Sequence, residues 1–255
     1  MVSQPMVSII MPTYNAQATI KESIASVTAQ TYPHWELIVV DDASRDNTPE
    51  IVRALAKDNP RIRLHTNPQN AGVALSRNAG MAHAHGEWLA FLDSDDFWHE
   101  DKLQKQLQFM ETQNAAISYT GTSYINDAGQ LSDYVLRAEP ELTYKDLLRR
   151  NIMSCSSVMV RRECMVPFSP GEAHEDYAAW MQILQKTDCA YGLDEPLLVY
   201  RMTKKSKSAK RLLSAKMTYH AYRKAQIGRL GAAAYTVRYA AHSLTKRRMV
   251  AMGWA

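Results

Sequence analysis

This 255-residue sequence is poor in the features that mark several specialised classes of protein. Its 3 cysteines, Cys155, Cys164 and Cys189, lack the CxxC spacing of zinc sites and form an odd set, which indicates a reducing compartment without a disulfide framework. No apolar run is long enough to cross a membrane, and the first residues lack the basic start of a secretory signal. We therefore expect a cytoplasmic protein without membrane-spanning segments.

Acidic residues are absent from the C-terminal part of the chain. All 26 aspartates and glutamates lie at or before Glu195, whereas basic residues continue to Arg248, so the net charge of +4 combines an acidic body with a basic tail. Such a tail favours an anionic partner, either a membrane surface or a polyphosphate. Nucleic acid is not an expected partner, because no DNA- or RNA-binding motif accompanies the charge.

Strand and helix patterns alternate over residues 1–115. Short apolar segments predict strands, and segments with apolar residues at helical spacing follow them. The predicted strands are Val7–Met11, Glu36–Val40, Arg61–His65 and Trp88–Leu92, and the predicted helices are Ala16–Thr31, Asn47–Asp58, Val73–His85 and Glu100–Thr112. Repeated βα units of this kind predict an α/β fold with a Rossmann-like, mostly parallel sheet flanked by helices.

The pattern changes after Ala115. Strand-like pieces now mix with helices, and we expect them to complete the sheet. The predicted strands are Ile117–Tyr124, Ser156–Val160 and Leu197–Tyr200, and the predicted helices are Thr143–Arg149 and Glu175–Lys186. Residues 206–255 form a separate basic, aromatic-rich tail with two predicted helices, near 210–227 and 232–250.

The most informative segment is Trp88–Trp98, in which an apolar run stops at three carboxylates, Asp93, Asp95 and Asp96. An apolar run of this kind is typical of a strand buried on both faces of a parallel sheet, and ligands bind beyond the carboxyl ends of such strands. Carboxylates crowded there repel each other unless a cation lies among them. Mg²⁺ or Mn²⁺ prefers such oxygen ligands and usually accompanies a phosphate.

Two further polar clusters follow predicted strands: Pro12–Asn15 after the first, and Asp41–Ser44 with Asp46 after the second. Turn formation by aspartate and serine explains the second cluster equally well when it is taken alone. Because the carboxyl ends of parallel strands share one edge of a sheet, the three clusters together predict a ligand crevice at that edge.

Two helix starts add candidate groups. In Asn70–Gly80, Arg77 is suited to a bidentate contact with phosphate or carboxylate, while Gly80 fits either a ligand contact or a close helix–sheet contact. In His174–Asp176, an acid in the first helical turn is either a partner of the helix dipole or a general base for a hydroxyl.

These segments together resemble glycosyltransferase family 2, whose members are inverting transferases of the GT-A fold, and in particular the type that assembles polysaccharide or lipopolysaccharide. The matching segments span about the first 200 residues in the expected order: VSIIMPTYN (Val7–Asn15), ELIVVDDASRD (Glu36–Asp46), NAGVALSRNAG (Asn70–Gly80), GEWLAFLDSDD (Gly86–Asp96) and HEDYAAW (His174–Trp180). The resemblance implies that residues 1–205 form the catalytic domain, with 1–115 binding the nucleotide-sugar and 116–205 binding the acceptor.

The resemblance also implies roles for individual residues. The set expected to bind the donor is Pro12, Tyr14, Asn15, Asp42, Arg77, Asp93, Ser94 and Arg201. Within it, Pro12 and Asn15 line the base and ribose pocket, and Asp42 bonds a uracil-type base. Asp95 ligates Mn²⁺ or Mg²⁺, and Asp93 contacts the ribose or the metal. Asp176 is the base that deprotonates the acceptor hydroxyl.

The chain departs from the family pattern in two places. Many relatives carry a histidine shortly after a YR dipeptide, but none follows Tyr200-Arg201 here. Arg201, Lys204 or Lys205 then serves the diphosphate, or the segment is a solvated basic linker. The QxxRW-type motif of processive members is also absent, which together with the lack of membrane spans predicts one sugar added per acceptor.

The tail interleaves cations with aromatic residues, namely Tyr219, Tyr222, Tyr235, Tyr239 and Trp254. Amphipathic helices of this composition lie in membrane interfaces with aromatics inward and cations toward anionic headgroups. We expect the tail to hold the protein at the cytoplasmic face of the inner membrane, beside a lipid-linked acceptor. The alternative is that these stripes pack on the catalytic domain or on a second subunit.

The leading prediction is therefore a metal-dependent, inverting transferase that moves one sugar from a nucleotide-diphospho-sugar, with UDP favoured, to a glycan or lipid-linked oligosaccharide. The alternative is a non-catalytic, membrane-associated scaffold that binds nucleotide-sugar. A phosphatase of the haloacid dehalogenase type is disfavoured, because its nucleophilic aspartate follows the first strand, which here ends in PTYN.

Overall fold

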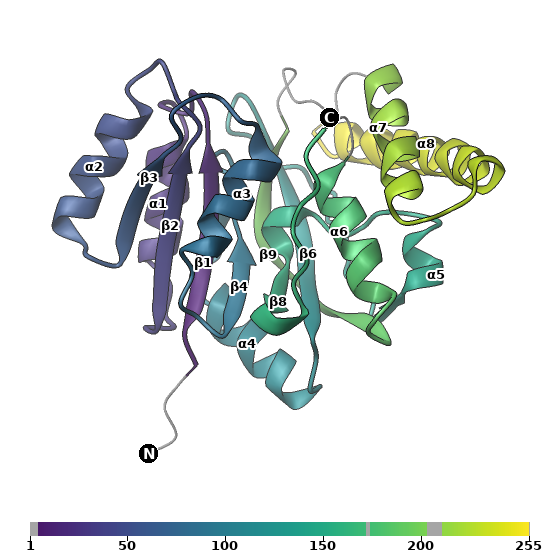
Figure 1. The fold of residues 1–255 in the computed structure, drawn as a ribbon, viewed down its shortest axis with the longest axis horizontal. Helices are drawn as coiled ribbons and strands as arrows, with labels where there is room; N and C mark the ends of the chain where they lie inside the picture. Colours follow the sequence, from purple (N-terminus) through teal and green to yellow (C-terminus); the bar gives the residue numbers. More distant parts are fainter. Residues whose placement is uncertain (1–4, 172–173, 203–210, 255) are drawn as a thin grey trace.

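The computed structural model describes residues 5–171, 174–202 and 211–254 (Figure 1). Within these residues, nine strands form one sheet. Its first part is parallel throughout and runs in the order β3 (Ile62–Thr66), β2 (Trp35–Asp41), β1 (Val7–Thr13) and β4 (Trp88–Phe91). The carboxyl ends of these strands therefore lie at one edge, as the sequence predicts.

The second part of the sheet is mixed. Its order is β8 (Met159–Arg161), β6 (Ile117–Asn126), β9 (Cys189–Met202) and β5 (Phe97–Trp98), with β7 (Glu141–Thr143) also paired to β9. Strand β8 is antiparallel to β4 and β6, while β6 and β9 are parallel. The predicted α/β architecture, with helices flanking a mainly parallel central sheet, is confirmed.

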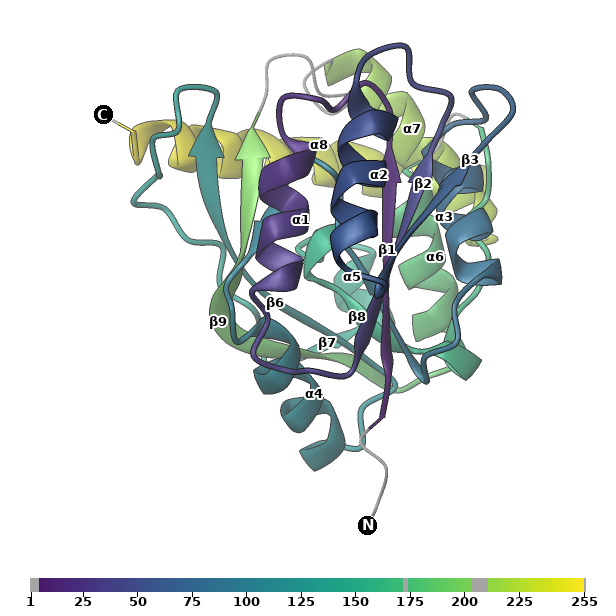
Figure 2. The same ribbon diagram turned by 90° about the vertical axis from the view of Figure 1, so that its left-hand side faces the viewer.

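Helices cover both faces of the sheet (Figures 1 and 2). One face carries α1 (Ile20–Thr28), α2 (Thr48–Asp58) and α4 (Lys102–Thr112), and the other carries α3 (Val73–Ala82) and α6 (Glu175–Leu184). Shorter helical elements are α5 (Tyr144–Leu147), η1 (Cys155–Ser157) and η2 (Arg162–Cys164), and the tail forms α7 (Arg211–Lys224) and α8 (Arg229–Met252).

Alternation along β1 explains this layering. Ile9 and Met11 belong to the apolar cluster that contains Ile24 of α1, whereas Ile10 belongs to the cluster that contains Trp180 of α6. Successive side chains of a strand point to opposite faces, so an uninterrupted apolar strand needs a helical layer on each side. This is why β1, β2 and β4 are buried at every position, whereas β3 at the edge of the sheet alternates apolar and polar residues and is only partly buried.

Gly80 lies where α3 meets the sheet. A Cβ atom at this position would lie 2.7 Å from the side chain of Ile10, closer than real Cβ atoms approach their neighbours. The close helix–sheet contact, one of the two interpretations left open by the sequence, is therefore the one present.

The two tail helices pack on the domain. The aromatic side chains that the sequence predicts to face a membrane lie against protein: Tyr222 is fully buried, and the ring of Tyr239 lies 5.6 Å from that of Tyr177 on α6. Tyr219, Tyr235 and Trp254 pack against the same cluster. Since α6 presents apolar surface on the side away from the sheet, the aromatic stripe covers it. No helix within the described residues is long and apolar enough to cross a membrane.

Boundaries differ most where elements are short. Strands β5 and β7 were not predicted, because two or three residues show no periodicity. The predicted strand Ser156–Val160 begins instead as the turn η1 and becomes extended only at Met159. The predicted strand Leu197–Tyr200 lies in the C-terminal half of the much longer β9.

Candidate active site

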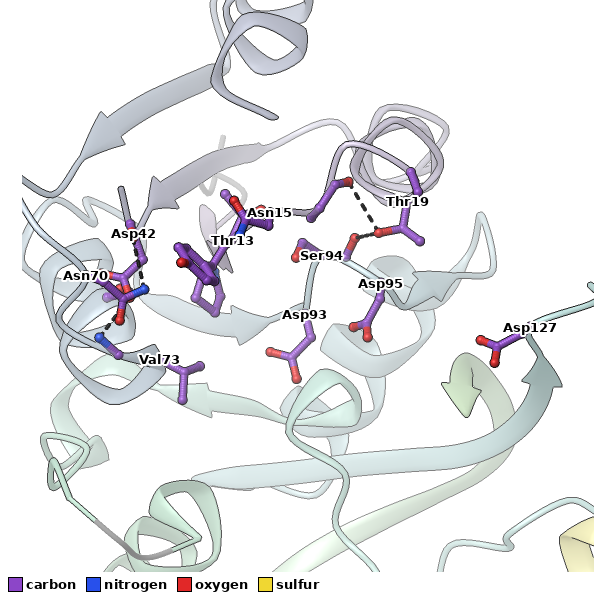
Figure 3. Close-up of a pocket in the computed structure, with 16 residues that line it drawn as sticks. Thr13, Asn15, Thr19, Asp42, Asn70, Val73, Asp93, Ser94, Asp95 and Asp127 are labelled. Carbon is purple, nitrogen blue, oxygen red and sulfur yellow. Dashed lines mark hydrogen bonds between the residues drawn. The ribbon is translucent and has the colours of Figure 1, made fainter. Parts of the chain in front are cut away.

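A pocket of about 1020 Å³ opens at the carboxyl ends of β1, β2 and β4 (Figure 3). It contains side chains from all three clusters that the sequence predicts to converge. The lining comprises Pro12, Thr13, Tyr14, Asn15, Ala16, Ala18, Thr19, Asp42, Asn70, Gly72, Val73, Ser76, Asp93, Ser94, Asp95 and Asp127. A concave site at this edge is the expected ligand crevice of an open α/β sheet.

Asp42 closes one end of the pocket, beside Asn70 (Figure 3). Its carboxylate accepts hydrogen bonds from the amides of Ala71 and Gly72 and from the side chain of Asn67, each at 2.8 Å. Burial alone would raise the pKa of Asp42, but these bonds lower the pKa below its usual value. A hydrogen bond from the side chain of Ser76 lowers the pKa further, so the Asp42 carboxylate holds the loop at this end of the pocket in place.

Asn15 links the first two clusters. Its backbone has a φ of 51°, in the left-handed region that asparagine tolerates well. Its amide donates to Ser44 Oγ at 2.9 Å, and its side-chain oxygen accepts from the amide of Arg45 at 2.8 Å. Part of the polar character of this cluster therefore serves loop structure, while Tyr14 next to it is 45% exposed at the pocket.

Asp95 lines the pocket, and few protein groups offset the negative charge of its carboxylate. Among the described residues, no side chain forms a hydrogen bond or ion pair with its carboxylate, which has a hydrogen bond only with its own backbone amide. Burial and, after it, the charge of Asp93 raise the pKa of Asp95 to about 6. A pocket-lining carboxylate in this condition favours binding of a cation.

Arg77 joins the pocket to α6. It is buried, with only 3% of its side chain exposed, and it pairs with Asp93 at 2.6 Å and with Glu175 at 2.7 Å. These charges keep its pKa well above the usual value despite burial, so the guanidinium remains charged. Arg77 does not line the pocket, and its ion pair holds Asp93 in place.

Asp176 lies beside that link, in the first turn of α6. One of its oxygens accepts a hydrogen bond from the amide of Tyr177 at 2.7 Å. Burial and then the neighbouring charge of Glu175 raise the pKa of Asp176. A carboxylate with a raised pKa is better matched to accepting a proton near neutrality.

Asp96 and Arg201 stabilise the loop of residues 93–96 that follows β4, here called the acidic loop. Asp96 is 1% exposed and accepts hydrogen bonds from Ser156 Oγ at 2.6 Å and from the amide of Arg201 at 2.9 Å. The Arg201 side chain donates to the carbonyl of Asp95 at 3.0 Å and pairs with Glu22. Arg201 thus supports the loop and does not line the pocket; Lys204 and Lys205 lie outside the described residues.

The donor atoms of the pocket fit a hard divalent cation. Asp95 and Asp93 supply carboxylate oxygens, the ligands that Mg²⁺ and Mn²⁺ prefer. The described residues contain no group of three or more histidine, cysteine or acidic side chains placed to hold a metal. A cation bound here would therefore complete its coordination with water and with oxygens of a ligand, as Mg²⁺ commonly does.

The structure brings most of the predicted residues together. Those in the pocket are Pro12, Tyr14, Asn15, Asp42, Asp93, Ser94 and Asp95, while Arg77 and Asp176 lie behind it and Arg201 lies beneath the acidic loop. Sequence reasoning missed Thr19, which donates to the carbonyl of Ser94 at 2.8 Å, and Asp127, which lies at the far end of the pocket (Figure 3). Neither carries a sequence signal, because Thr19 precedes a helix and Asp127 lies in a loop after β6.

The family model for glycosyl transferase family 2 matches residues 8–166, which contain the whole pocket. The chain belongs to glycosyl transferase family 2. Two relatives are similar over much of their length. A putative teichuronic acid biosynthesis glycosyltransferase of Bacillus subtilis is 39% identical over 249 residues, covering 96% of this chain and 98% of the relative. The Escherichia coli enzyme WfgD, named as a UDP-Glc:α-D-GlcNAc-diphosphoundecaprenol β-1,3-glucosyltransferase, is 41% identical over 181 residues, covering 71% and 70%.

Two solved structures share the fold of this family 2 chain. TarS of S. aureus, in complex with UDP-GlcNAc, aligns with a TM-score of 0.72 at 19% identity, covering 89% of this chain and 69% of TarS. The mannosyltransferase PcManGT of Pyrobaculum calidifontis, in complex with GDP-Man and Mn²⁺, aligns with a TM-score of 0.71 at 23% identity, covering 97% and 76%. The GT-A fold expected from the resemblance is thereby confirmed.

Proposed function

We propose that this glycosyltransferase moves a single sugar from a UDP-sugar to a hydroxyl of a lipid-linked glycan, with inversion at the anomeric carbon. The names of its relatives support this: teichuronic acid biosynthesis for the Bacillus protein, and transfer from UDP-Glc onto a diphosphoundecaprenol-linked sugar for the Escherichia protein. The proposed donor carries a hexose or an N-acetylhexosamine, and the proposed process is assembly of a bacterial surface polysaccharide at the cytoplasmic face of the membrane.

The observation that carries the proposal is a continuous series of contacts between the pocket and Asp176, the proposed general base. Asp93 at the pocket, Arg77 behind it and Glu175 on α6 form one chain of ion pairs, and Asp176 follows Glu175 directly. A donor in the pocket and an acceptor beside α6 are thus positioned by one set of contacts. Fixed relative placement of two reactants is a major source of rate enhancement.

In the proposed reaction, Asp176 accepts the proton of the acceptor hydroxyl. The acceptor oxygen forms a bond to the anomeric carbon on the face opposite the diphosphate, and the bond between that carbon and the diphosphate oxygen breaks. The electron pair leaves with the nucleoside diphosphate, so one displacement inverts the centre and needs no covalent enzyme intermediate. Asp42 and Asn15 hold the base and ribose, and Asp95 with Asp93 would hold Mn²⁺ or Mg²⁺, which would supply positive charge to the leaving diphosphate.

A donor panel tests the proposal. Purified protein is mixed with UDP-, GDP- and dTDP-sugars, with Mn²⁺, Mg²⁺ or a chelator, and scored by thermal shift and by slow nucleotide release. We expect metal-dependent stabilisation by the UDP class and release of UDP. Equal stabilisation in chelator would overturn the metal dependence. Nucleotide binding without turnover on any lipid-linked acceptor would favour the non-catalytic scaffold.

A further inference from the structure

Helix α8 has two apolar faces. The inner face packs on the domain through Ala232, Tyr239 and Val250. The outer face carries the most exposed of the large apolar side chains in the described chain: Leu230 is 89% exposed and Val237 is 72% exposed. Exposed leucine or valine scattered singly needs no explanation, but a cluster on one element marks an interaction surface.

The outer residues fall on one line. Leu230, Val237 and Leu244 are spaced by seven, about two turns of a helix with 3.6 residues per turn, and Met252 continues the line at 59% exposure. We call these four residues the α8 outer stripe. By the same geometry Arg248 falls on the stripe and Arg238 lies beside it, and both are exposed. The face therefore combines apolar side chains with cations.

The outer stripe lies at the end of the molecule that carries the active site. In Figure 1 α8 lies beside the sheet, to the right of β6 and β9, and in Figure 2 it runs at the level where β6 and β9 end, toward the same end as the carboxyl ends of β1 and β2. A surface that docks through this helix thus lies at the same end of the molecule as the pocket.

We propose that the α8 outer stripe docks on the surface of an anionic lipid bilayer, with the stripe in the interface and Arg238 and Arg248 on lipid phosphates. This inference rests on the proposed function for the presence of a lipid-linked acceptor there. Charge decides between a bilayer and a second copy of the chain. No acidic residue follows Glu195, so two outer stripes placed face to face would oppose arginine to arginine without a carboxylate between them.

Vesicle flotation of the full-length protein tests the inference. The probes are vesicles of phosphatidylglycerol and phosphatidylcholine, compared with phosphatidylcholine alone. The test variant is Val237→Glu with Leu244→Glu, and the matched control is Leu75→Glu on α3, where the leucine is 41% exposed on another element. We expect the wild type and the control to float with anionic vesicles, and the double variant to lose at least about tenfold in partitioning.

Flotation of the double variant as complete as that of the wild type would overturn the inference. So would a wild type that is dimeric by light scattering, becomes monomeric in the double variant, and never floats, because the stripe would then join two copies. If the double variant does not fold, Arg238→Gln with Arg248→Gln replaces it, with an expected loss of the preference for anionic vesicles. Thermal shift with UDP and metal on the same samples reports on the donor pocket separately, so failure of docking is distinguishable from failure of the proposed activity.

Discussion

The carboxylate of Asp95 in the pocket and the hydroxyl of Tyr222 in the tail lie in opposite polar environments. In the pocket, the carboxylate of Asp95 has no side-chain hydrogen-bond or ion-pair partner among the described residues, and its pKa rises to about 6. In the tail, the hydroxyl of Tyr222 lies 2.9 Å from that of Tyr177 and donates to the carbonyl of Leu148 at 2.8 Å. A carboxylate that lines a cavity without side-chain partners favours a ligand site, whereas a buried hydroxyl with two partners favours a structural role.

The difference predicts two classes of variant. Substitutions of the pocket carboxylates should remove activity at little cost in the free energy of unfolding. The reason is that neighbouring carboxylates repel each other in the native protein, and removing one relieves that repulsion. Changes at the paired hydroxyls should cost stability first. Four substitutions test this contrast. A pocket variant that loses mainly stability, or a hydroxyl variant that loses mainly activity, would contradict it.

Asp95→Asn is expected to have the largest effect. It removes a charge proposed to hold the metal, so kcat/KM should fall by a factor on the order of 10⁴, corresponding to several kcal/mol of transition-state stabilisation. Metal-dependent thermal stabilisation by UDP should also disappear. The control is Asp58→Asn at the exposed end of α2, which should match the wild type. Retained metal-dependent donor binding in Asp95→Asn would contradict the assignment.

Asp176→Asn should lower kcat by a factor on the order of 10³ with donor binding kept, as for loss of a general base. Because the pKa of Asp176 is raised in the folded protein, its ionisation costs stability as the pH rises above the ordinary aspartate value. The asparagine variant should therefore melt at a temperature equal to or above that of the wild type at pH 8. A lower melting temperature together with wild-type turnover would show that Asp176 is structural.

Tyr222→Phe tests the second class, substitutions at hydroxyls that are hydrogen-bonded within the protein. It removes the donor to the carbonyl of Leu148, and leaving that buried carbonyl without a partner should cost about 1–3 kcal/mol in the free energy of unfolding. Urea unfolding measures this. The control is Tyr219→Phe, because no hydrogen bond to that hydroxyl is found in the described part of the chain. Equal stability of the two variants would mean that the hydroxyl pair contributes nothing.

Glu175→Gln is expected to have the smallest effect. The charge of Glu175 is the second cause, after burial, of the raised pKa of Asp176, and its loss also frees Arg77 to act on Asp176. Both changes favour the ionised base, so the acidic limb of the pH–rate profile should move to lower pH. A profile that is unchanged, or that moves to higher pH, would contradict the proposed coupling between the two acids.

The first part of the fold could be predicted from sequence because its signals are local. The apolar strands around Ile10 and Phe91 end in polar clusters, and parallel strands bring such ends to one edge. The positions of Arg77 and Asp176 behind the pocket could not be predicted, since their link through Glu175 joins elements 98 residues apart in the chain. The scaffold role of Arg201 depends equally on strand pairing at the end of β9.

Periodicity predicted both tail helices but did not decide which face of α8 points outward. Both faces are apolar, so the aromatic residues around Tyr239 were the conspicuous stripe, and these are the residues that pack on Tyr177. The aliphatic residues of the α8 outer stripe stay exposed. Only the presence of α6, with apolar surface on the side away from the sheet, decides between the two faces.

The packing of α7 and α8 on α6 also sets an order of events during synthesis. Both helices follow α6 in the chain, so the helix that carries Asp176 lacks its apolar cover until they have been translated. The strands β1 to β4 and their loops precede them and pair with one another. A growing chain therefore gains the framework of the proposed nucleotide pocket before Asp176, the proposed proton acceptor, is fixed in place.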